Sequence, residues 1–110
     1  MKRGEIWTSA GGPNYAGKPR PVLIVQDDAF EGTDSVTICL LTSHGDDAPL
    51  LRPIIEATAE SGLRGSTWAM VDKIGTVPRT RLGRRIGTLA PAAMRPVNQA
   101  MLVFLGLTGR

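Results

Sequence analysis

Short apolar runs separated by polar turns occupy most of the chain before residue 90. Runs of about four to eight apolar or alternating residues are typical of strands, and Gly, Pro, Asn and Asp mark the turns between them. In the clearest run, Val36, Ile38 and Leu40 alternate onto one face and Cys39 lies on the other. We predict strands at residues 2–8, 21–26, 35–42, 51–57, 66–71 and 85–89.

The segments between these runs are polar, and three of them stand out. Residues 9–18 are rich in Gly, Pro, Asn and Ser, and this loop is longer than a hairpin requires, as functional loops often are. Residues 43–49 form a second polar loop. Residues 75–81 are predicted to be irregular, because Pro78 disfavours a central strand.

After residue 90 the apolar period changes to three or four residues, which predicts an amphipathic helix. Pro91 suits the first helical position and Gly106 a stop, whereas Pro96 should bend or delay the helix. The apolar stripe consists of Met94, Val97, Met101, Phe104 and Leu105. These elements favour one domain, 1–110, of α+β class: a small SH3-like, partly open β-barrel of five to seven short strands with a C-terminal helix.

Composition excludes several classes of protein and site. The chain has 110 residues, 42% of them hydrophobic, and its longest unbroken apolar stretch, 100–105, is too short to cross a membrane. No apolar segment follows Lys2 and Arg3, so we expect a cytoplasmic protein without a signal peptide or membrane contact. One cysteine, Cys39, and one histidine, His44, allow neither an intramolecular disulfide nor a Cys/His metal cluster. We therefore expect a domain that acts without a disulfide or zinc scaffold, and we expect no cofactor.

Positive charge is concentrated in the second half of the chain. The net charge is only +3, but residues 61–110 contain eight basic residues and one acidic residue. Six of these eight lie between Arg64 and Arg85, and arginine suits bidentate contact with phosphate. This patch indicates a nucleic-acid footprint. A solvated basic face, or arginines paired with the acidic residues of the first half, would give the same composition.

Five short motifs occur in a fixed order over nearly the whole chain. They are KRGEIW at 2–7, RPVLIV at 20–25, LTS at 41–43, VDKI at 71–74 and RIGTL at 85–89. In this order the chain resembles the MazF/PemK family of bacterial toxins, the ribonucleases of type II toxin–antitoxin pairs. Gly75 stands where an arginine is common in that family, and residues 13–17 replace its usual Gly-Ser-Glu sequence.

The resemblance implies a homodimer of SH3-like barrels and a cognate acidic antitoxin as partners. It also implies sequence-specific, metal-independent cleavage of single-stranded RNA to a 2′,3′-cyclic phosphate and a 5′-hydroxyl, which inhibits translation and growth. The family's arginine before the Pro-Val strand falls on Arg20, and its active-site threonine falls on Thr42. We expect further RNA contacts from Asn14, Tyr15, Lys18, Ser43, His44, Asp72 and Lys73.

Arg20 and Thr42 suit this chemistry, because RNA supplies its own nucleophile, the 2′-hydroxyl. The enzyme must align that hydroxyl and offset the charge that develops on phosphorus. Arg20 is a poor general base and is assigned to charge stabilisation; it is also a candidate for protonating the leaving group. Thr42 would position the scissile phosphate. The residue that accepts the 2′-hydroxyl proton stays open.

Structural interpretations compete with these roles. Arg20 could bridge to Glu5 or Asp27, and a threonine such as Thr42 at a strand end is often a turn residue. His44 is a candidate acid or base, although the family pattern requires no histidine there.

The remaining aromatic residues and Cys39 also have structural interpretations. Trp7 and Trp68 lie in predicted strands and are assigned to the core, whereas Tyr15, in a loop, could stack on a base. Cys39 is assigned a structural role, and the helix stripe a core or dimer contact. Two other functions stay open: a non-enzymatic toxin of the same fold that binds DNA gyrase, and an SH3-like RNA-binding module without activity.

Overall fold

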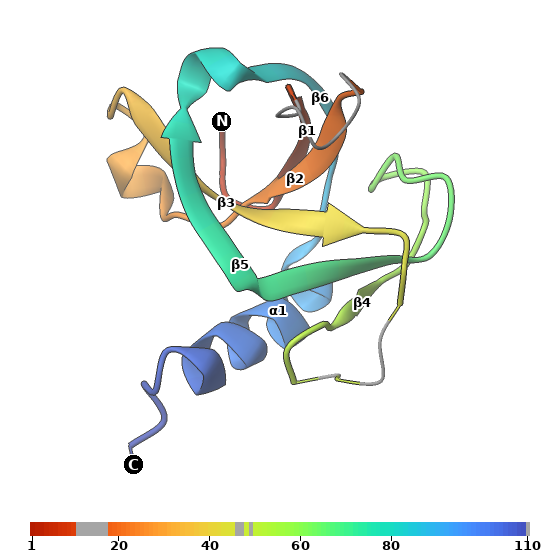
Figure 1. Ribbon diagram of the computed structural model, residues 1–110, viewed down its shortest axis with the longest axis vertical. Helices are drawn as coiled ribbons and strands as arrows, with labels where there is room; N and C mark the ends of the chain where they lie inside the picture. Colours follow the sequence, from red (N-terminus) through yellow and green to blue (C-terminus); the bar gives the residue numbers. More distant parts are fainter. Residues whose placement is uncertain (11–17, 46–47, 49, 110) are drawn as a thin grey trace.

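Among the residues that the structure describes, one six-stranded sheet with only antiparallel pairings forms the framework of the molecule (Figure 1). The computed structural model describes residues 1–10, 18–45, 48 and 50–109. The strands are β1 (Glu5–Ser9), β2 (Arg20–Ile24), β3 (Ser35–Thr42), β4 (Ile54–Ile55), β5 (Thr67–Pro78) and β6 (Leu82–Thr88), in the spatial order β4-β5-β3-β2-β1-β6. The sheet curls on itself, and the helix α1 (Pro91–Phe104) packs outside the curl. This is the predicted partly open barrel with a C-terminal helix.

Two apolar clusters lie on opposite faces of the sheet, as the alternation in residues 35–42 predicted. Cys39 is fully buried in the helix-side cluster, and Ile38 is buried in the barrel-side cluster. The helix-side cluster contains Ile6, Leu23, Val25, Cys39, Leu41, Ile55, Ala69, Val71, Leu89, Met94, Val97 and Ala100. The barrel-side cluster contains Val22, Ile24, Val36, Ile38 and Leu82, with Trp7 packed against it. The core role of Trp7 and the structural role of Cys39 are therefore confirmed.

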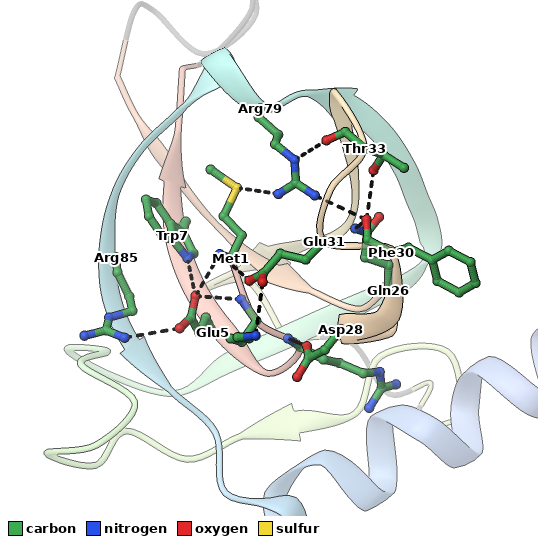
Figure 2. Close-up of polar contacts among 12 residues, drawn as sticks. Met1, Glu5, Trp7, Gln26, Asp28, Phe30, Glu31, Thr33, Arg79 and Arg85 are labelled. Carbon is green, nitrogen blue, oxygen red and sulfur yellow. Dashed lines mark hydrogen bonds and ion pairs between the residues drawn. The ribbon is translucent and has the colours of Figure 1, made fainter.

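Polar contacts gather around the first residues of the chain (Figure 2). The Met1 ammonium lies 3.2 Å from Glu31 Oε2, and Glu5 accepts hydrogen bonds from Trp7 Nε1 at 3.0 Å and from Arg85 at 3.1 Å. Burial by itself raises the pKa of Glu5, but the hydrogen bonds that it accepts outweigh burial and lower the pKa. Glu5 is thus an ionised anchor for β1 and β6.

The helix begins where predicted, despite its internal proline. Pro91 occupies the first turn after the N-cap residue Ala90, and the helix continues through Pro96 to Phe104. The expectation that Pro96 delays the helix is wrong, because packing of Met94 and Val97 in the core outweighs one missing hydrogen bond. None of the helices in the described residues is long and apolar enough to cross a membrane.

Several strand boundaries differ from the prediction. The predicted irregular segment 75–81 is largely strand, since β5 extends to Pro78. In the described residues this end of β5 pairs only with β3. Pro78 has no N–H to donate, but no second strand lies there to need one, so the proline is tolerated. Conversely, the strand predicted at 51–57 shortens to Ile54–Ile55. Pro53, which cannot donate, interrupts the ladder although its carbonyl still accepts from Ala69 N–H at 2.9 Å.

Apart from the seven-residue extension of β5, the other strand ends shift by one to three residues. Of the strands predicted at 2–8, 21–26, 66–71 and 85–89, the structure has Glu5–Ser9, Arg20–Ile24, Thr67–Pro78 and Leu82–Thr88. Only the strand predicted at 35–42 matches at both ends, as β3.

Candidate functional site

The pairing of β2 with β3 brings Arg20 and Thr42 together. Val22 pairs with Leu40 and Ile24 with Ile38, and continuing this register places Arg20 opposite Thr42. Directly opposed residues of an antiparallel pair project from the same face, with Cβ atoms about 5 Å apart. That face also carries the barrel-side cluster, so the two side chains extend it beyond its last apolar residues.

A cavity of about 400 Å³ lies at this end of the sheet. The polar and flexible side chains that line it belong to Arg20, Thr42, Ser43, His44, Thr67, Met70 and Lys73. We refer to it as the Arg20–Thr42 cavity. The structure therefore brings together five of the residues selected from the sequence, namely Arg20, Thr42, Ser43, His44 and Lys73. Met70 was missed, because nothing in a strand sequence distinguishes it from a core methionine.

Thr42 forms a turn and keeps a donor for a ligand. The His44 backbone N–H donates to Thr42 Oγ1 at 3.1 Å, which fixes the start of the loop after β3. The hydroxyl oxygen is the acceptor in this bond, so its hydrogen stays available to donate into the cavity. The turn interpretation of Thr42 and the phosphate-positioning interpretation are compatible.

The ring of Trp68 lies beneath this loop. Trp68 pairs with Thr42 across β3 and β5, and a Cβ built on Gly45 would come within 2.7 Å of its ring atoms. Contacts that short do not occur between real side chains, so Gly45 permits the loop to pack tightly on the indole. The core assignment of Trp68 is wrong, because it is half-buried and outside both apolar clusters.

The two carboxylates proposed as structural partners of Arg20, those of Glu5 and Asp27, accept hydrogen bonds from other donors. Glu5 accepts from Lys2 N–H, Trp7 and Arg85, and Asp27 accepts from Ala29 N–H at 2.8 Å. Arg20 itself is exposed at the first position of β2.

An irregularity in β5 directs Lys73 toward the cavity and Asp72 away from it. Cys39 pairs with Ile74 but Leu40 pairs with Met70, so residues 71–73 bulge out of the ladder. Lys73 lines the cavity, whereas Asp72 does not. Instead, Arg52 holds both oxygens of Asp72, at 2.8 and 3.1 Å, and this bidentate pair lowers the pKa of Asp72.

Of the three other residues expected to contact RNA, the structure describes only Lys18. Lys18 is exposed but does not line the cavity. Asn14 and Tyr15 lie outside the described residues.

The basic residues between Arg64 and Arg85 divide into two groups. Arg79 and Arg85 stabilise the barrel, since Arg79 donates to the carbonyls of Thr33 and Phe30, and Arg85 pairs with Glu5 (Figure 2). Composition left open whether these arginines pair with acidic residues in the first half of the chain, and Arg85 does so. The other four line cavities: Arg64, Lys73, Arg81 and Arg84.

Cys39 is unsuited to be a nucleophile. Burial raises the pKa of its thiol to about 12, and the nearby charge of Asp72 adds to this effect. The thiolate, which is the reactive form, is therefore scarce at neutral pH. Within residues 1–10, 18–45, 48 and 50–109, no three His, Cys, Asp or Glu side chains gather as metal ligands would.

The groups that line the cavity are of the kinds that bind phosphodiesters. A guanidinium offers two aligned donors to the non-bridging oxygens, a hydroxyl offers a third, and Lys73 adds positive charge. Such preorganised donors stabilise charge that develops during phosphoryl transfer.

Comparison with known proteins gives a consistent result. Residues 2–105 match the family model described as PemK-like, MazF-like toxin of type II toxin–antitoxin system. The chain is 50% identical to a "Probable endoribonuclease MazF" of Mycolicibacterium smegmatis over 109 residues, covering 99% of this chain and 100% of that protein. It is 27% identical to "Endoribonuclease MazF9" of Mycobacterium tuberculosis, covering 97% and 98%. A solved mycobacterial "Endoribonuclease in complex with its cognate antitoxin" superimposes with a TM-score of 0.83, 26% identity and coverage of 100% and 99%.

Proposed function

The chain belongs to the PemK-like, MazF-like toxins of type II toxin–antitoxin systems, and on this basis we propose that it is an endoribonuclease acting on single-stranded RNA. Its products would be a 2′,3′-cyclic phosphate and a 5′-hydroxyl, and the chemistry would require no metal. The observation that carries the proposal is that Arg20 and Thr42, which the continued register of β2 and β3 places opposite each other, line a single cavity.

In this mechanism the RNA 2′-hydroxyl gives its proton to water while its oxygen attacks the adjacent phosphorus, and the bond from phosphorus to the 5′-oxygen breaks. Arg20 donates to the non-bridging oxygens as negative charge builds there, and is the candidate to protonate the leaving 5′-oxygen. Arg20 recovers from water any proton that it gives to the leaving oxygen. Thr42 donates its hydroxyl hydrogen to the same phosphate and holds it in line with the 2′-hydroxyl. His44 lies close enough to line the cavity, but the mechanism assigns it no proton.

The deciding experiment is incubation of the purified protein with single-stranded RNA in excess EDTA, followed by end-group analysis. We expect cleavage to fragments with cyclic phosphate and 5′-hydroxyl ends. Cleavage only after a divalent ion is restored would contradict the metal-free mechanism. RNA binding without cleavage would favour the inactive module, and gyrase inhibition without cleavage would favour the gyrase-binding toxin.

We propose further that residues 1–110 act as one domain, in the cytoplasm, as a homodimer that a cognate acidic antitoxin inhibits. Large apolar side chains at the end of α1 and just after it support a protein contact there, because contiguous exposed apolar surface usually marks an interface. They are Leu102, Val103, Phe104, Leu105 and Leu107, each 39–65% exposed. Sedimentation at micromolar concentration should give a dimer; a single 11.7 kDa species would refute this part of the proposal.

A further inference from the structure

A second and larger cavity borders the Arg20–Thr42 cavity. Its volume is about 920 Å³, and the two cavities share Pro21, Ser43 and Thr67. Arg20 and Thr42 project from the barrel side of the sheet, and by alternation along β2 Pro21 projects from the other side. The shared residues therefore form a ridge with one cavity on each side, and we refer to the larger one as the second cavity.

The lining of the second cavity combines apolar walls with a few polar groups. Pro19, Pro21, Leu63 and Ile86 supply apolar surface. Ser43 and Ser66 supply hydroxyls, and the backbone N–H groups of residues 64 and 65 take part in no hydrogen bond among the described residues. A cavity of this size and character suits a flat heterocycle that has hydrogen-bonding edges.

Two arginines at the second cavity carry the complementary charge for a nucleic acid. The side chains of Arg64 and Arg84 are exposed, and no acidic side chain in the described part of the chain forms an ion pair with either. Arg84 is fixed in β6, where its backbone N–H donates to Thr8 Oγ1 at 3.0 Å. Two guanidinium groups beside apolar walls match phosphates flanking a base.

We propose that the second cavity binds one unstacked nucleobase of the RNA substrate, near the scissile phosphate, and thereby selects the sequence that is cleaved. Arg64 and Arg84 hold the phosphates next to that base, while the ridge at Pro21 and Ser43 turns the strand out of the Arg20–Thr42 cavity. The inference rests on the proposed ribonuclease function and adds to it a specificity-determining site.

Gly65 offers a way to fill the second cavity without straining the fold. A Cβ built on Gly65 meets no atom within 4 Å, and Gly65 is not among the glycines with positive φ. Gly32 shares both properties and lies in the turn before β3, away from both cavities, so it is a matched control.

The experiment compares wild-type protein with Gly65→Phe and Gly32→Phe on a randomised single-stranded RNA pool, with cleavage positions determined by sequencing the products. Filling the second cavity should relax base preference at one position and lower kcat/KM on the wild-type target at least tenfold. Gly32→Phe should keep the wild-type cleavage profile.

A second pair of variants covers the case in which Gly65→Phe fails to fold. Arg84→Ala should reduce the slope of log affinity against log salt for RNA by about one, as expected for loss of one phosphate contact. Arg95→Ala, which removes an exposed arginine on α1, should leave that slope unchanged.

Three results would overturn the inference. These are a cleavage profile unchanged in folded Gly65→Phe, a salt slope unchanged in Arg84→Ala, and a Gly65→Phe protein that loses activity because it no longer dimerises. The last result would assign the second cavity to the subunit interface. Failure of the wild-type protein to cleave RNA at all would refute the proposed function instead, so the two failures are distinguishable.

Discussion

At the residue scale, Arg20 is the side chain on which the proposed chemistry depends most. We expect Arg20→Ala to reduce RNA cleavage by about a hundredfold to a thousandfold, the usual effect of removing one transition-state donor. The fold should survive, because Arg20 is exposed at the edge of β2. Single-turnover cleavage of a fluorescent RNA, with circular dichroism as the control for folding, measures both effects. Residual activity above about a tenth of the wild-type rate would exclude Arg20 from catalysis.

The neighbouring residues should rank below Arg20. Thr42→Ala removes one donor but leaves the guanidinium, so we expect a smaller loss than for Arg20→Ala. His44→Ala should lose little, because Thr42 is bonded to the His44 backbone and not to its imidazole. A loss for His44→Ala as large as that for Arg20→Ala would instead identify His44 as the missing acid or base, which the same assay would reveal.

Arg52 and Asp72 form the ion pair whose effect on stability should depend on pH. Because Arg52 lowers the pKa of Asp72, the pair stabilises the fold above the unfolded-state pKa of Asp, about 3.9, and loses that contribution as pH falls through the folded-state pKa. We expect Arg52→Gln to lower the free energy of unfolding by about 1 kcal/mol at pH 7 and by much less near pH 3. Urea denaturation at the two pH values tests this.

The exposed Lys2–Glu31 pair provides the control for that measurement. Lys2→Gln should change stability little at either pH, because exposed pairs contribute little. An equal loss for Arg52→Gln at pH 7 and pH 3 would mean that Arg52 acts through packing and not through the charge of Asp72.

At the scale of elements, the end of α1 depends on one glycine. Gly106 has φ of 73°, and the Leu107 N–H donates to the Leu102 carbonyl at 2.8 Å, as in a Schellman cap. A Cβ on Gly106 would meet nothing within 4 Å, so only backbone strain opposes Gly106→Ala. We expect that substitution to cost about 1 kcal/mol, or roughly 4–8 °C in Tm, measured by thermal denaturation. Gly32→Ala, whose φ is not positive, should cost less; equal losses would show that the cap is unimportant.

At the scale of the whole molecule, the charges around both cavities should make RNA binding more sensitive to salt than antitoxin binding. If Arg20, Lys73, Arg64 and Arg84 make about four phosphate contacts, affinity for a single strand should fall roughly fiftyfold between 50 and 200 mM salt. An antitoxin tail would keep its apolar contacts at high salt, so its affinity should fall less than that of RNA. Titrations of catalytically inactive Arg20→Lys protein with an RNA oligonucleotide, and with the cognate antitoxin proposed above, measure both affinities. RNA affinity that does not change with salt concentration would contradict binding through these charges. An antitoxin that binds without preventing RNA cleavage would contradict a site shared by RNA and antitoxin.

The local pattern of residues accounts for much of the fold. Alternation in residues 35–42 predicted both ends of β3 and the opposite burial of Ile38 and Cys39, because successive strand residues must face opposite sides. The apolar period and Pro91 predicted the start of α1. The order of short motifs identified the family, and with it Arg20 and Thr42, which lie twenty-two positions apart in the chain.

Tertiary structure decided what depends on partners distant in sequence. Whether Pro78 ends a strand depends on how many neighbours β5 has at that point, and Pro96 is tolerated because core packing outweighs one hydrogen bond. Asp72 pairs with Arg52 because a bulge in β5 sets the direction of its side chain. Arg85 pairs with Glu5 because β1 and β6 are adjacent. Sequence by itself determined which groups the chain possesses and how each strand alternates; only the curled sheet decided which of them meet, because contacts between strands are set by register and curvature rather than by neighbours along the chain.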